Sequence, residues 1–463
     1  MMLIAMGSAA TGRAEAAAPA RVAVLLQAEG LQKSGDLGGG VRVGVISGGV
    51  RDQAVLLRQG ILPADVALLG SGHGRGDEGD WMMQIVHQIA PAAKLGFCAG
   101  GRPAKTVGCA SALIDKFHAD IIIDDVNPQP VIFRPTVKDL GLAALARQHP
   151  KELLFTGVGN NGAGYYQSNW MATPLTLSGV AYQAQDFGTS VQGGSQAFNS
   201  FVVPAGAAAV VDLGTNALPA SPMAPCPERN PLVTLALADR SGHIVRQAES
   251  ACPGLSLFYR NTSGQRQAMR VAVLLPAIAH PKDLALKLVV LRAGEGISPL
   301  PLLFHTSGAV GNSATSAGLV AVAAGDPDSI QGGHYQIEPY SNSGAQCMAY
   351  SAGPHGQLQR LAKPSCFEQP AFVVPDKTVV TMVGPRGLRP RPFGGNSAAG
   401  PAAAGAAALL LARHVPPLRI VPLLEQSALA LPGHQGWDGQ YGYGLINVGA
   451  AASLGHDSGA AQK

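Results

Sequence analysis

Residues 394–401 read GGNSAAGP and run directly into the apolar segment AAAGAAALLLA at 402–412. One hydroxyl, that of Ser397, lies here among very small residues at the start of an expected buried helix. The two glycines leave room for a peptide backbone to approach, and Pro401 suits the first turn of a helix. The positive end of that helix favours an anion formed at Ser397. Helix capping is the alternative role for this serine, but it leaves the glycine clearance unexplained.

Strand and helix patterns alternate along most of the chain. Short β-branched runs predict strands, and apolar residues at helical spacing predict the helices between them. This alternation predicts an α/β fold with a mostly parallel sheet covered by helices on both faces. Functional side chains are then expected at the carboxyl ends of the strands. The main expected strands lie within 41–47, 94–98, 120–126, 153–162, 318–326 and 370–383.

The pattern changes near residue 186, where helical periodicity disappears and short alternating runs begin. This change predicts an all-β, sandwich-like insert that interrupts the α/β domain. The first 36 residues contain a short apolar run and an A-E-A sequence, and they are interpreted as the remnant of an export signal without its basic residues. The chain is therefore divided into an N-terminal segment, the first α/β part, the insert, the second α/β part with Ser397 and a tail: 1–36, 37–185, 186–300, 301–455 and 456–463.

Composition narrows the classes of partner. The chain has 463 residues, 47% hydrophobic and 13% charged, with a net charge of +4. These values describe a compact globular protein. Lys and Arg are scattered, so nucleic acid is not an expected partner, and no integral membrane span is expected because Gly, Pro or charge interrupts every apolar segment. A secreted or cell-envelope location is expected from the signal-like N-terminus.

Cysteine spacing predicts disulfides and gives little support to a metal site. The six cysteines fall as neighbours along the chain, which is compatible with the local pairs Cys98–Cys109, Cys226–Cys252 and Cys347–Cys366. No Cys/His spacing typical of zinc is present, and no loop gathers the carboxylates of a calcium site. We therefore expect no metal and no cofactor.

Several segments resemble the subtilisin-like serine peptidases in order and spacing. The segment at 395–401 resembles the motif G-T-S-M-A-x-P, with Asn396 in place of Thr. Four others resemble the first catalytic strand, the oxyanion-asparagine loop, the F-S-S-x-G strand and the closing segment: VRVGVISGG, TGVGNNG, YSNSG and GYGLINVGAA. The resemblance implies a subtilisin-like fold, Ser397 as nucleophile and Asn160 as oxyanion donor. A simple turn asparagine is the alternative role for Asn160.

The other two members of the usual triad are absent. The first strand ends in Ser47 where the family has an aspartate, and Glu78 occupies the place of the histidine, aligned by the I-A-P that follows the helix. A glutamate there resembles the sedolisins, which use a Ser-Glu-Asp set at acidic pH. Their aspartate lies one helical turn after the glutamate, where this chain has Met82. His73 is a weaker candidate base because five polar or glycine residues separate it from the apolar helix.

A second carboxylate is expected from Asp124 or Asp125, at the end of an apolar strand that the resemblance places beside the serine. Successive residues of a strand point to opposite faces, so only one of the two reaches the site, and Asp125 is our choice. The alternative is a pair that forms a salt bridge or caps the next loop. The same strand end implies peptide contacts at Val126 and Asn127, and the oxyanion loop implies one at Gly159.

Together these residues predict a serine-type endopeptidase that hydrolyses a protein or peptide substrate with a carboxylate as base. Glu78 can accept the serine proton, although an ordinary glutamate is a weak base at neutral pH and a second carboxyl is needed to raise its pKa. The missing acids favour the alternative, a catalytically inactive subtilase-like binding or structural protein. Esterase or amidase action by the same serine is a third hypothesis.

Overall fold

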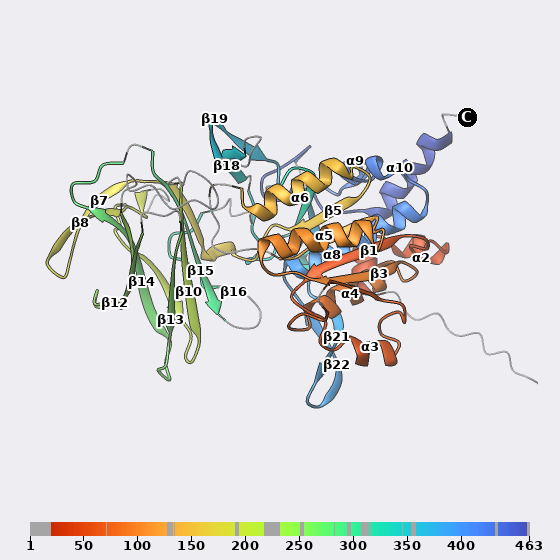
Figure 1. Cartoon of the computed structure of the whole chain (residues 1–463), viewed down its shortest axis with the longest axis horizontal. Helices are drawn as coiled ribbons and strands as arrows, with labels where there is room; N and C mark the ends of the chain where they lie inside the picture. The colour runs from red at the N-terminus through yellow and green to blue at the C-terminus, as the bar shows by residue number, and fades with distance from the viewer. Residues whose placement is uncertain are drawn as a thin grey trace, which may run out of the picture.

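The computed structural model has two lobes, an α/β lobe and a β lobe (Figure 1). It describes residues 20–70, 72–126, 133, 135–189, 194–216, 232–250, 254–281, 283–293, 298–306, 314, 316–344, 346–352, 358–430 and 434–460.

The α/β lobe is built on a seven-stranded sheet in which every neighbouring pair is parallel. The strands are buried runs of β-branched and other apolar residues, as a sheet covered on both faces requires. Their order across the sheet is β2 (Ala67–Leu69), β3 (Lys94–Ala99), β1 (Arg42–Ser47), β4 (Ile121–Asp124), β5 (Leu153–Gly157), β17 (Leu319–Gly325) and β20 (Phe372–Pro375). The predicted parallel sheet is confirmed.

Helices cover both faces of this sheet. Helices α4 (Glu78–Ile89) and α8 (Asn396–Ala412) pack together over one face, and α5 (Pro103–Asp115) and α6 (Val137–Gln148) over the other. Each face has its own apolar cluster, and alternate residues of the central strands contribute to one cluster or the other. The remaining helices are α1 (Arg21–Leu25), α2 (Glu29–Lys33), α3 (Gln53–Arg58), α7 (Pro327–Gln331), α9 (Pro417–Ser427) and α10 (Val448–Ala460).

Helix α8 begins earlier than the sequence predicts. It starts at Asn396 instead of near Pro401, and residues 396–410 are all buried. Helix α8 is rich in small side chains because it runs between α4 and the sheet, where large side chains have no room. Pro401 therefore lies inside the helix and cannot donate a hydrogen bond to the carbonyl of Ser397. Ser397 lies in the first turn, after Gly395 at the N-cap, so it is not the capping residue itself.

The β lobe holds two antiparallel sheets around a separate apolar core, which confirms an all-β sandwich-like insert. Its antiparallel pairing begins at Tyr165, well before the expected boundary at residue 186. One sheet has the order β13 (Gly254–Arg260), β10 (Ala208–Thr215), β15 (Ala285–Ala293), β16 (Ser298–Pro299), with β6 (Tyr165–Asn169) on β15. The other has β12 (Ile244–Ser250), β11 (Val233–Ala238), β14 (Gln267–Pro276), β8 (Val180–Gln185), β7 (Ala172–Leu177), with β9 (Asn199–Val203) on β14.

Two hairpins and a short 3-10 helix complete the described elements. The predicted strand at 370–383 is only partly correct, because β20 joins the parallel sheet whereas β21 (Thr378–Gly384) leaves it and pairs with β22 (Gly387–Phe393). The second hairpin consists of β18 (Gln346–Ala352) and β19 (Leu358–Phe367), and the 3-10 helix η1 spans Gly162–Gly164.

Disulfides join two of the three predicted cysteine pairs, Cys98–Cys109 and Cys347–Cys366. The predicted Cys226–Cys252 pair lies outside the described residues. Among the described helices, none alone is long and apolar enough to cross a membrane. Helices α8 and α9 meet that length and composition only as a pair bent by 118°.

Candidate active site

Ser397 lies at the sheet face that carries α4 and α8, and the residue is 8% exposed. The residue before the helix, Gly395, has a φ of 103°, a conformation that glycine adopts without strain. Among the described residues, the backbone N–H of Ser397 has no hydrogen-bond partner, as expected for the first turn of a helix. The serine hydroxyl and an unpaired N–H group therefore lie together at the positive end of α8.

Glu78 is the first residue of α4 and contacts this serine. The hydroxyl of Ser47 donates to Glu78 Oε2 at 3.2 Å, and the hydroxyl of Ser397 also interacts with this carboxylate and lowers its pKa. Burial raises the pKa of Glu78, and these two hydroxyl groups partly offset the rise. Ser47 lies at the position where the sequence resemblance implied an aspartate. A carboxylate there would repel Glu78, whereas the hydroxyl of Ser47 stabilises it.

Asp125, the residue directly after β4, contacts the same serine. Residues Ile121 and Ile123 face the apolar cluster around α4 and α8, and Asp125 continues that alternation just beyond the strand. The hydroxyl of Ser397 interacts with its carboxyl and lowers the pKa of Asp125, but burial acts more strongly in the other direction. Burial raises the pKa of Asp125 well above its ordinary value, and the nearby Glu78 raises it further.

Asp124 points to the opposite face, where it meets Lys138 of α6. The Lys138 Nζ lies 2.6 Å from Asp124 Oδ2, and both side chains are buried, at 0% and 3% exposure. The Asp124 Oδ1 also accepts the N–H of Val126 at 3.2 Å. Asp124 therefore forms the salt bridge and turn that were the alternative role for the acidic pair, while Asp125 reaches the serine.

Hydrogen counting constrains the protonation of the two carboxyls. The hydroxyl of Ser397 has a single hydrogen, so it can donate to only one of Glu78 and Asp125. The other carboxyl can donate to the serine oxygen if it carries its own proton. Repulsion between two close carboxylates also favours a state in which the pair holds one proton. Glu78 receives a further hydroxyl donor from Ser47, which favours the charge on Glu78 and the proton on Asp125.

Asn160 lies beside Ser397 and is held by Asn396, the residue that precedes this serine. The Asn160 Oδ1 accepts the backbone N–H and the side-chain Nδ2 of Asn396, each at 2.8 Å. The Asn160 Nδ2 has no hydrogen-bond partner within the described part of the chain. Because the acceptor oxygen is occupied, the amide nitrogen remains as a donor. Gly157 lies where a Cβ would meet the Cβ of Asn396 at 2.5 Å, so a glycine is needed for this approach.

Two further residues hold the site loops, and sequence reasoning did not assign them a role. The Asn342 Oδ1 accepts the N–H groups of Asn161 and Gly162, both at 2.7 Å. The Asp376 Oδ2 accepts the N–H of Gly395 at 3.1 Å and a hydrogen bond from Tyr340. Asn342 belongs to the quoted YSNSG segment, which is a signal for its importance. Asp376 has no comparable motif around it.

The remaining predicted residues lie in different environments. Val126 is half-buried at the end of β4, whereas Asn127 lies outside the described residues. The Gly159 carbonyl already accepts the Asn342 N–H at 2.9 Å and the Asn396 Nδ2 at 2.7 Å. His73 lies in the loop before α4, as expected, and its carbonyl accepts the N–H of Val50 at 2.8 Å. Within the described residues, no group of three or more His, Cys, Asp or Glu is arranged to hold a metal ion.

Comparison with solved structures identifies the architecture. The chain matches the CspB protease of Clostridium perfringens with a TM-score of 0.52 and 12% identity, over 94% of this chain and 99% of that one. The fold is subtilisin-like. The MycP3 protease from the type VII (ESX-3) secretion system also matches, with a TM-score of 0.45 and 14% identity, over 95% of this chain and 90% of that one. No protein-family model and no curated protein matches the chain.

The resemblance to sedolisins that Glu78 implied is wrong. The CspB protease is subtilisin-like, and no detail specific to sedolisins appears in the described part of the chain. The sedolisin aspartate would lie at Met82, whose side chain is fully buried in the apolar cluster between α4 and α8. A carboxylate has no place in that cluster. The role of Glu78 therefore rests on its own contacts.

Proposed function

We propose that this protein is a serine endopeptidase in which Ser397 is the nucleophile and Glu78 is the base. The observation that carries the proposal is the interaction of one buried serine hydroxyl with two carboxyls, those of Glu78 and Asp125, whose pKa values it lowers. A structural serine has no need of two half-buried acids, each of which loses hydration by being there. The same first turn also offers the backbone N–H of Ser397, beside the Asn160 amide.

The proposed reaction moves one proton through Glu78. As the Ser397 oxygen attacks the carbonyl carbon of a peptide bond, its proton passes to the Glu78 carboxylate. The Asn160 Nδ2 and the Ser397 N–H stabilise the oxyanion that forms. Glu78 then gives the proton to the leaving nitrogen, which breaks the C–N bond and leaves an acyl-enzyme. Water attacks the ester, again with Glu78 as base, and Ser397 regains its proton.

Asp125 keeps its proton throughout this proposed cycle and acts as a donor to the site. Its neutral form avoids a second negative charge beside Glu78, and its high pKa is therefore part of the mechanism. Activity requires Glu78 ionised and Asp125 protonated. The rate is expected to rise with pH as Glu78 ionises and to fall again as Asp125 ionises, because these two acids titrate as a pair.

Further support comes from the fold and the disulfides. CspB, which shares the architecture, is a protease, and a protein or peptide substrate follows from the proposed activity. Two disulfides among the described residues agree with an oxidising compartment outside the cytosol, as the expected secreted or cell-envelope location requires. Val126 at the end of β4 is the described residue proposed to contact the peptide.

A fluorophosphonate probe tests the nucleophile and its base together. We expect the wild type to form an adduct on Ser397, located by peptide mass spectrometry, with a labelling rate that follows a bell-shaped pH profile between pH 4 and pH 9. E78Q should abolish labelling, because an amide cannot accept the proton. D125N should shift the profile, because the amide keeps a donor but removes one titrating group.

Matched controls separate chemistry from folding. D115N changes an exposed aspartate at the end of α5 and should label like the wild type. Thermal unfolding of E78Q shows whether the variant is folded. An absence of adduct on Ser397 at every pH, in folded protein, contradicts the proposal and supports the alternative of an inactive subtilase-like binding protein.

A further inference from the structure

The β21–β22 hairpin leads directly into the start of α8, which carries Ser397, and it bears three arginines that the proposed chemistry does not use. Arg386, Arg389 and Arg391 are all exposed. Among the described residues, none of the three has an ion-pair or hydrogen-bond partner. Three positive charges therefore lie close together without a described carboxylate to neutralise them.

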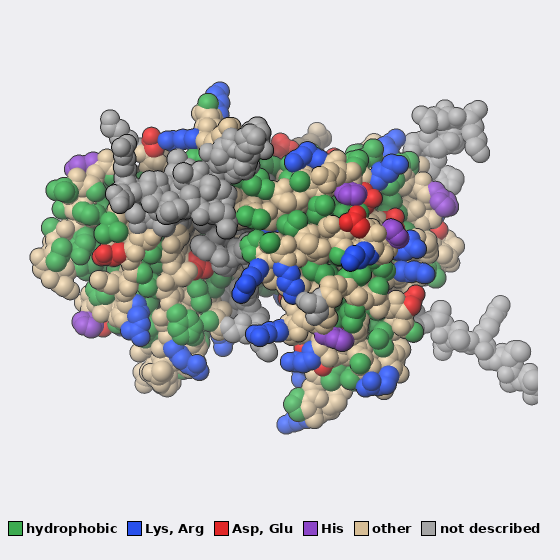
Figure 2. Space-filling model, viewed as in Figure 1, with side chains coloured by type: hydrophobic (Ala, Val, Ile, Leu, Met, Phe, Trp, Pro, Cys, Tyr) green, Lys and Arg blue, Asp and Glu red, His purple; other side chains and the backbone are tan. Residues whose placement is uncertain are grey.

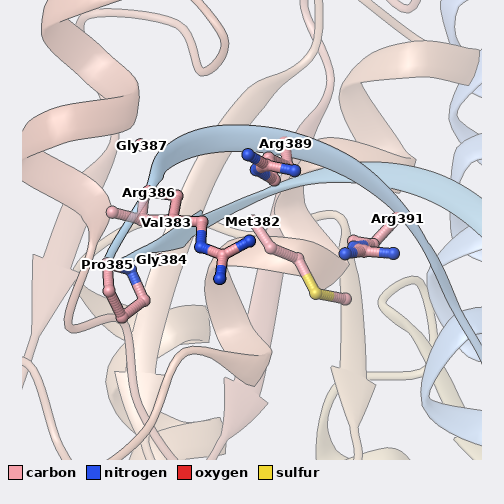
Figure 3. Close-up of a pocket in the computed structure, with 8 residues that line it drawn as sticks. All are labelled: Met382, Val383, Gly384, Pro385, Arg386, Gly387, Arg389 and Arg391. Carbon is pink, nitrogen blue, oxygen red and sulfur yellow. The ribbon is translucent and has the colours of Figure 1, made fainter.

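These arginines surround a hollow on one side of the hairpin. Strand alternation places Arg389 and Arg391 on one face, and the register sets Arg389 opposite Met382. Figure 3 shows the three guanidinium groups spread along the hairpin, with the Met382 side chain between Arg386 and Arg391. The hollow has a volume of about 350 Å³, and its lining includes Arg386, Arg389, Arg391, Met382, Val383 and Pro385.

The hairpin points toward the end of α4 that carries Glu78. The Gln88 Nε2 donates to the carbonyl of Val379 at 2.9 Å, and Gln84 exchanges two hydrogen bonds with Thr381, at 3.0 and 2.7 Å. The chain of β21 therefore runs toward the N-terminus of α4. The four residues from Gln88 to Gln84 and the two residues from Val379 to Thr381 each span about 6 Å. The tip of the hairpin therefore extends beyond the first residues of α4. Lys and Arg side chains are visible on and around this hairpin in Figure 2.

We propose that this hollow binds an acidic segment of a peptide substrate, away from the bond that is cleaved. Guanidinium groups bind carboxylates through paired hydrogen bonds, and the three free arginines match a run of Glu or Asp side chains. The apolar residues Met382, Val383 and Pro385 provide contacts for the peptide's carbon atoms. This inference rests on the proposed peptidase function, because it assigns a substrate class to that site.

The reach of the peptide limits where the acidic residues lie. An extended chain advances about 3.3 Å per residue, and β22 reaches Phe393 only four residues before Ser397. Acidic side chains roughly four to eight residues from the cleaved bond therefore reach the arginines. Nucleic acid fits less well, because its phosphate backbone is typically bound by an extended basic surface. The basic cluster described above is confined to one hairpin.

Binding to an inactive variant tests the inference without catalysis. S397A is titrated against fluorescein-labelled hexaglutamate and hexaglutamine, and anisotropy reports binding. We expect hexaglutamate to bind about tenfold more tightly than hexaglutamine, and R386Q/R389Q/R391Q to remove that difference. The charge-matched control R240Q/R246Q/R266Q removes three exposed arginines of the β lobe and should leave the difference intact. Equal binding of the two peptides, or no loss in the hairpin variant, overturns the inference.

Two further measurements separate the remaining outcomes. A labelled hexathymidylate that binds as tightly as hexaglutamate and is lost in the same hairpin variant overturns the peptide assignment in favour of a general polyanion site. Labelling of wild-type Ser397 by the fluorophosphonate reports the proposed function independently. Peptide binding without labelling supports the hollow and contradicts the peptidase, whereas labelling without peptide binding overturns the hollow alone.

Discussion

Replacement of Asp80 by asparagine should make the protein more stable at neutral pH but not at acidic pH. Asp80 lies in the first turn of α4 with 0% exposure, and its Oδ2 accepts the N–H of Asp52 at 3.0 Å. Its Oδ1 has no hydrogen-bond partner among the described residues. Burial raises the pKa of Asp80 from 3.8 to about 7, and the negative charges of Asp52 and Asp77 add to the rise.

The sign of the effect follows from proton linkage. The folded-state pKa of Asp80 lies above the unfolded one, so its contribution to stability is complete below pH 3.8 and is lost as pH rises through about 7. A shift of about three units corresponds to about 4 kcal/mol of unfolding free energy at pH 8. D80N cannot ionise, and its amide oxygen still accepts the Asp52 N–H. We therefore expect D80N to exceed the wild type by up to about 4 kcal/mol at pH 8 and to equal it near pH 4.

Urea unfolding between pH 4 and pH 8, followed by near-UV circular dichroism, measures this difference. D65N changes an exposed aspartate in the loop before β2 and is the matched control, with no expected pH-dependent gain. Parallel pH profiles of the unfolding free energy for D80N and the wild type would refute the reasoning. They would show that ionisation of the buried Asp80 does not lower stability.

Three other substitutions have defined outcomes. K138M leaves Asp124 buried without its cation and should cost about 3–5 kcal/mol of unfolding free energy, whereas K138M/D124L should recover most of that loss in the same urea assay. G405A places a methyl group within 2.9 Å of the Ile89 Cβ and should lower stability by about 1–3 kcal/mol, seen as a lower Tm, despite the helix preference of alanine. N160A should lower kcat for a peptide substrate by about 100-fold with little change in KM, and an equal rise in KM would instead indicate a substrate contact.

Local sequence patterns predict the parallel sheet well and its interruptions less well. The runs VRVGVIS and DIIIDDV contain β1 and β4. Both were predicted because the strands of a sheet covered on both faces need continuous apolar residues. The segment 370–383 looked like one strand, but it is interrupted at Asp376 and Lys377, and Lys377 has a φ of 49°. Asp376 at this break contacts Gly395 and Tyr340, which lie far from it in the sequence, and no local pattern reveals such contacts.

The start of the β lobe and the start of α8 were misplaced for a similar reason. Strand β6 pairs with β15, more than a hundred residues later, so its membership of the β lobe depends on a distant partner. Helix α8 was expected to begin near Pro401, because proline suits a first turn. The helix accommodates this proline one turn later, at the cost of one hydrogen bond to the Ser397 carbonyl.

The candidate site was partly visible in the sequence. Strand alternation separated Asp125 from Asp124, and the structure places them on the serine and on Lys138 respectively. The contact between Ser47 and Glu78 joins two elements 31 residues apart, and the sequence showed only that an acid was missing there. Asn342 likewise acts on a loop 180 residues earlier. Such long-range hydrogen bonds follow from the fold and have no periodic signal.

The unfolding free energy and the proposed catalytic rate are expected to change in opposite directions with pH. Burial raises the pKa of Asp376 to about 6 and of Asp80 to about 7, so both favour the folded state at acidic pH and cost stability as they ionise. Glu78 must ionise before it can act as the base, and its raised pKa moves that step above the ordinary glutamate range. Stability is therefore expected to fall as the pH rises through about 6 and then about 7, whereas the labelling rate is expected to rise as Glu78 ionises. A labelling rate and an unfolding free energy that both increase up to pH 9 would contradict this account.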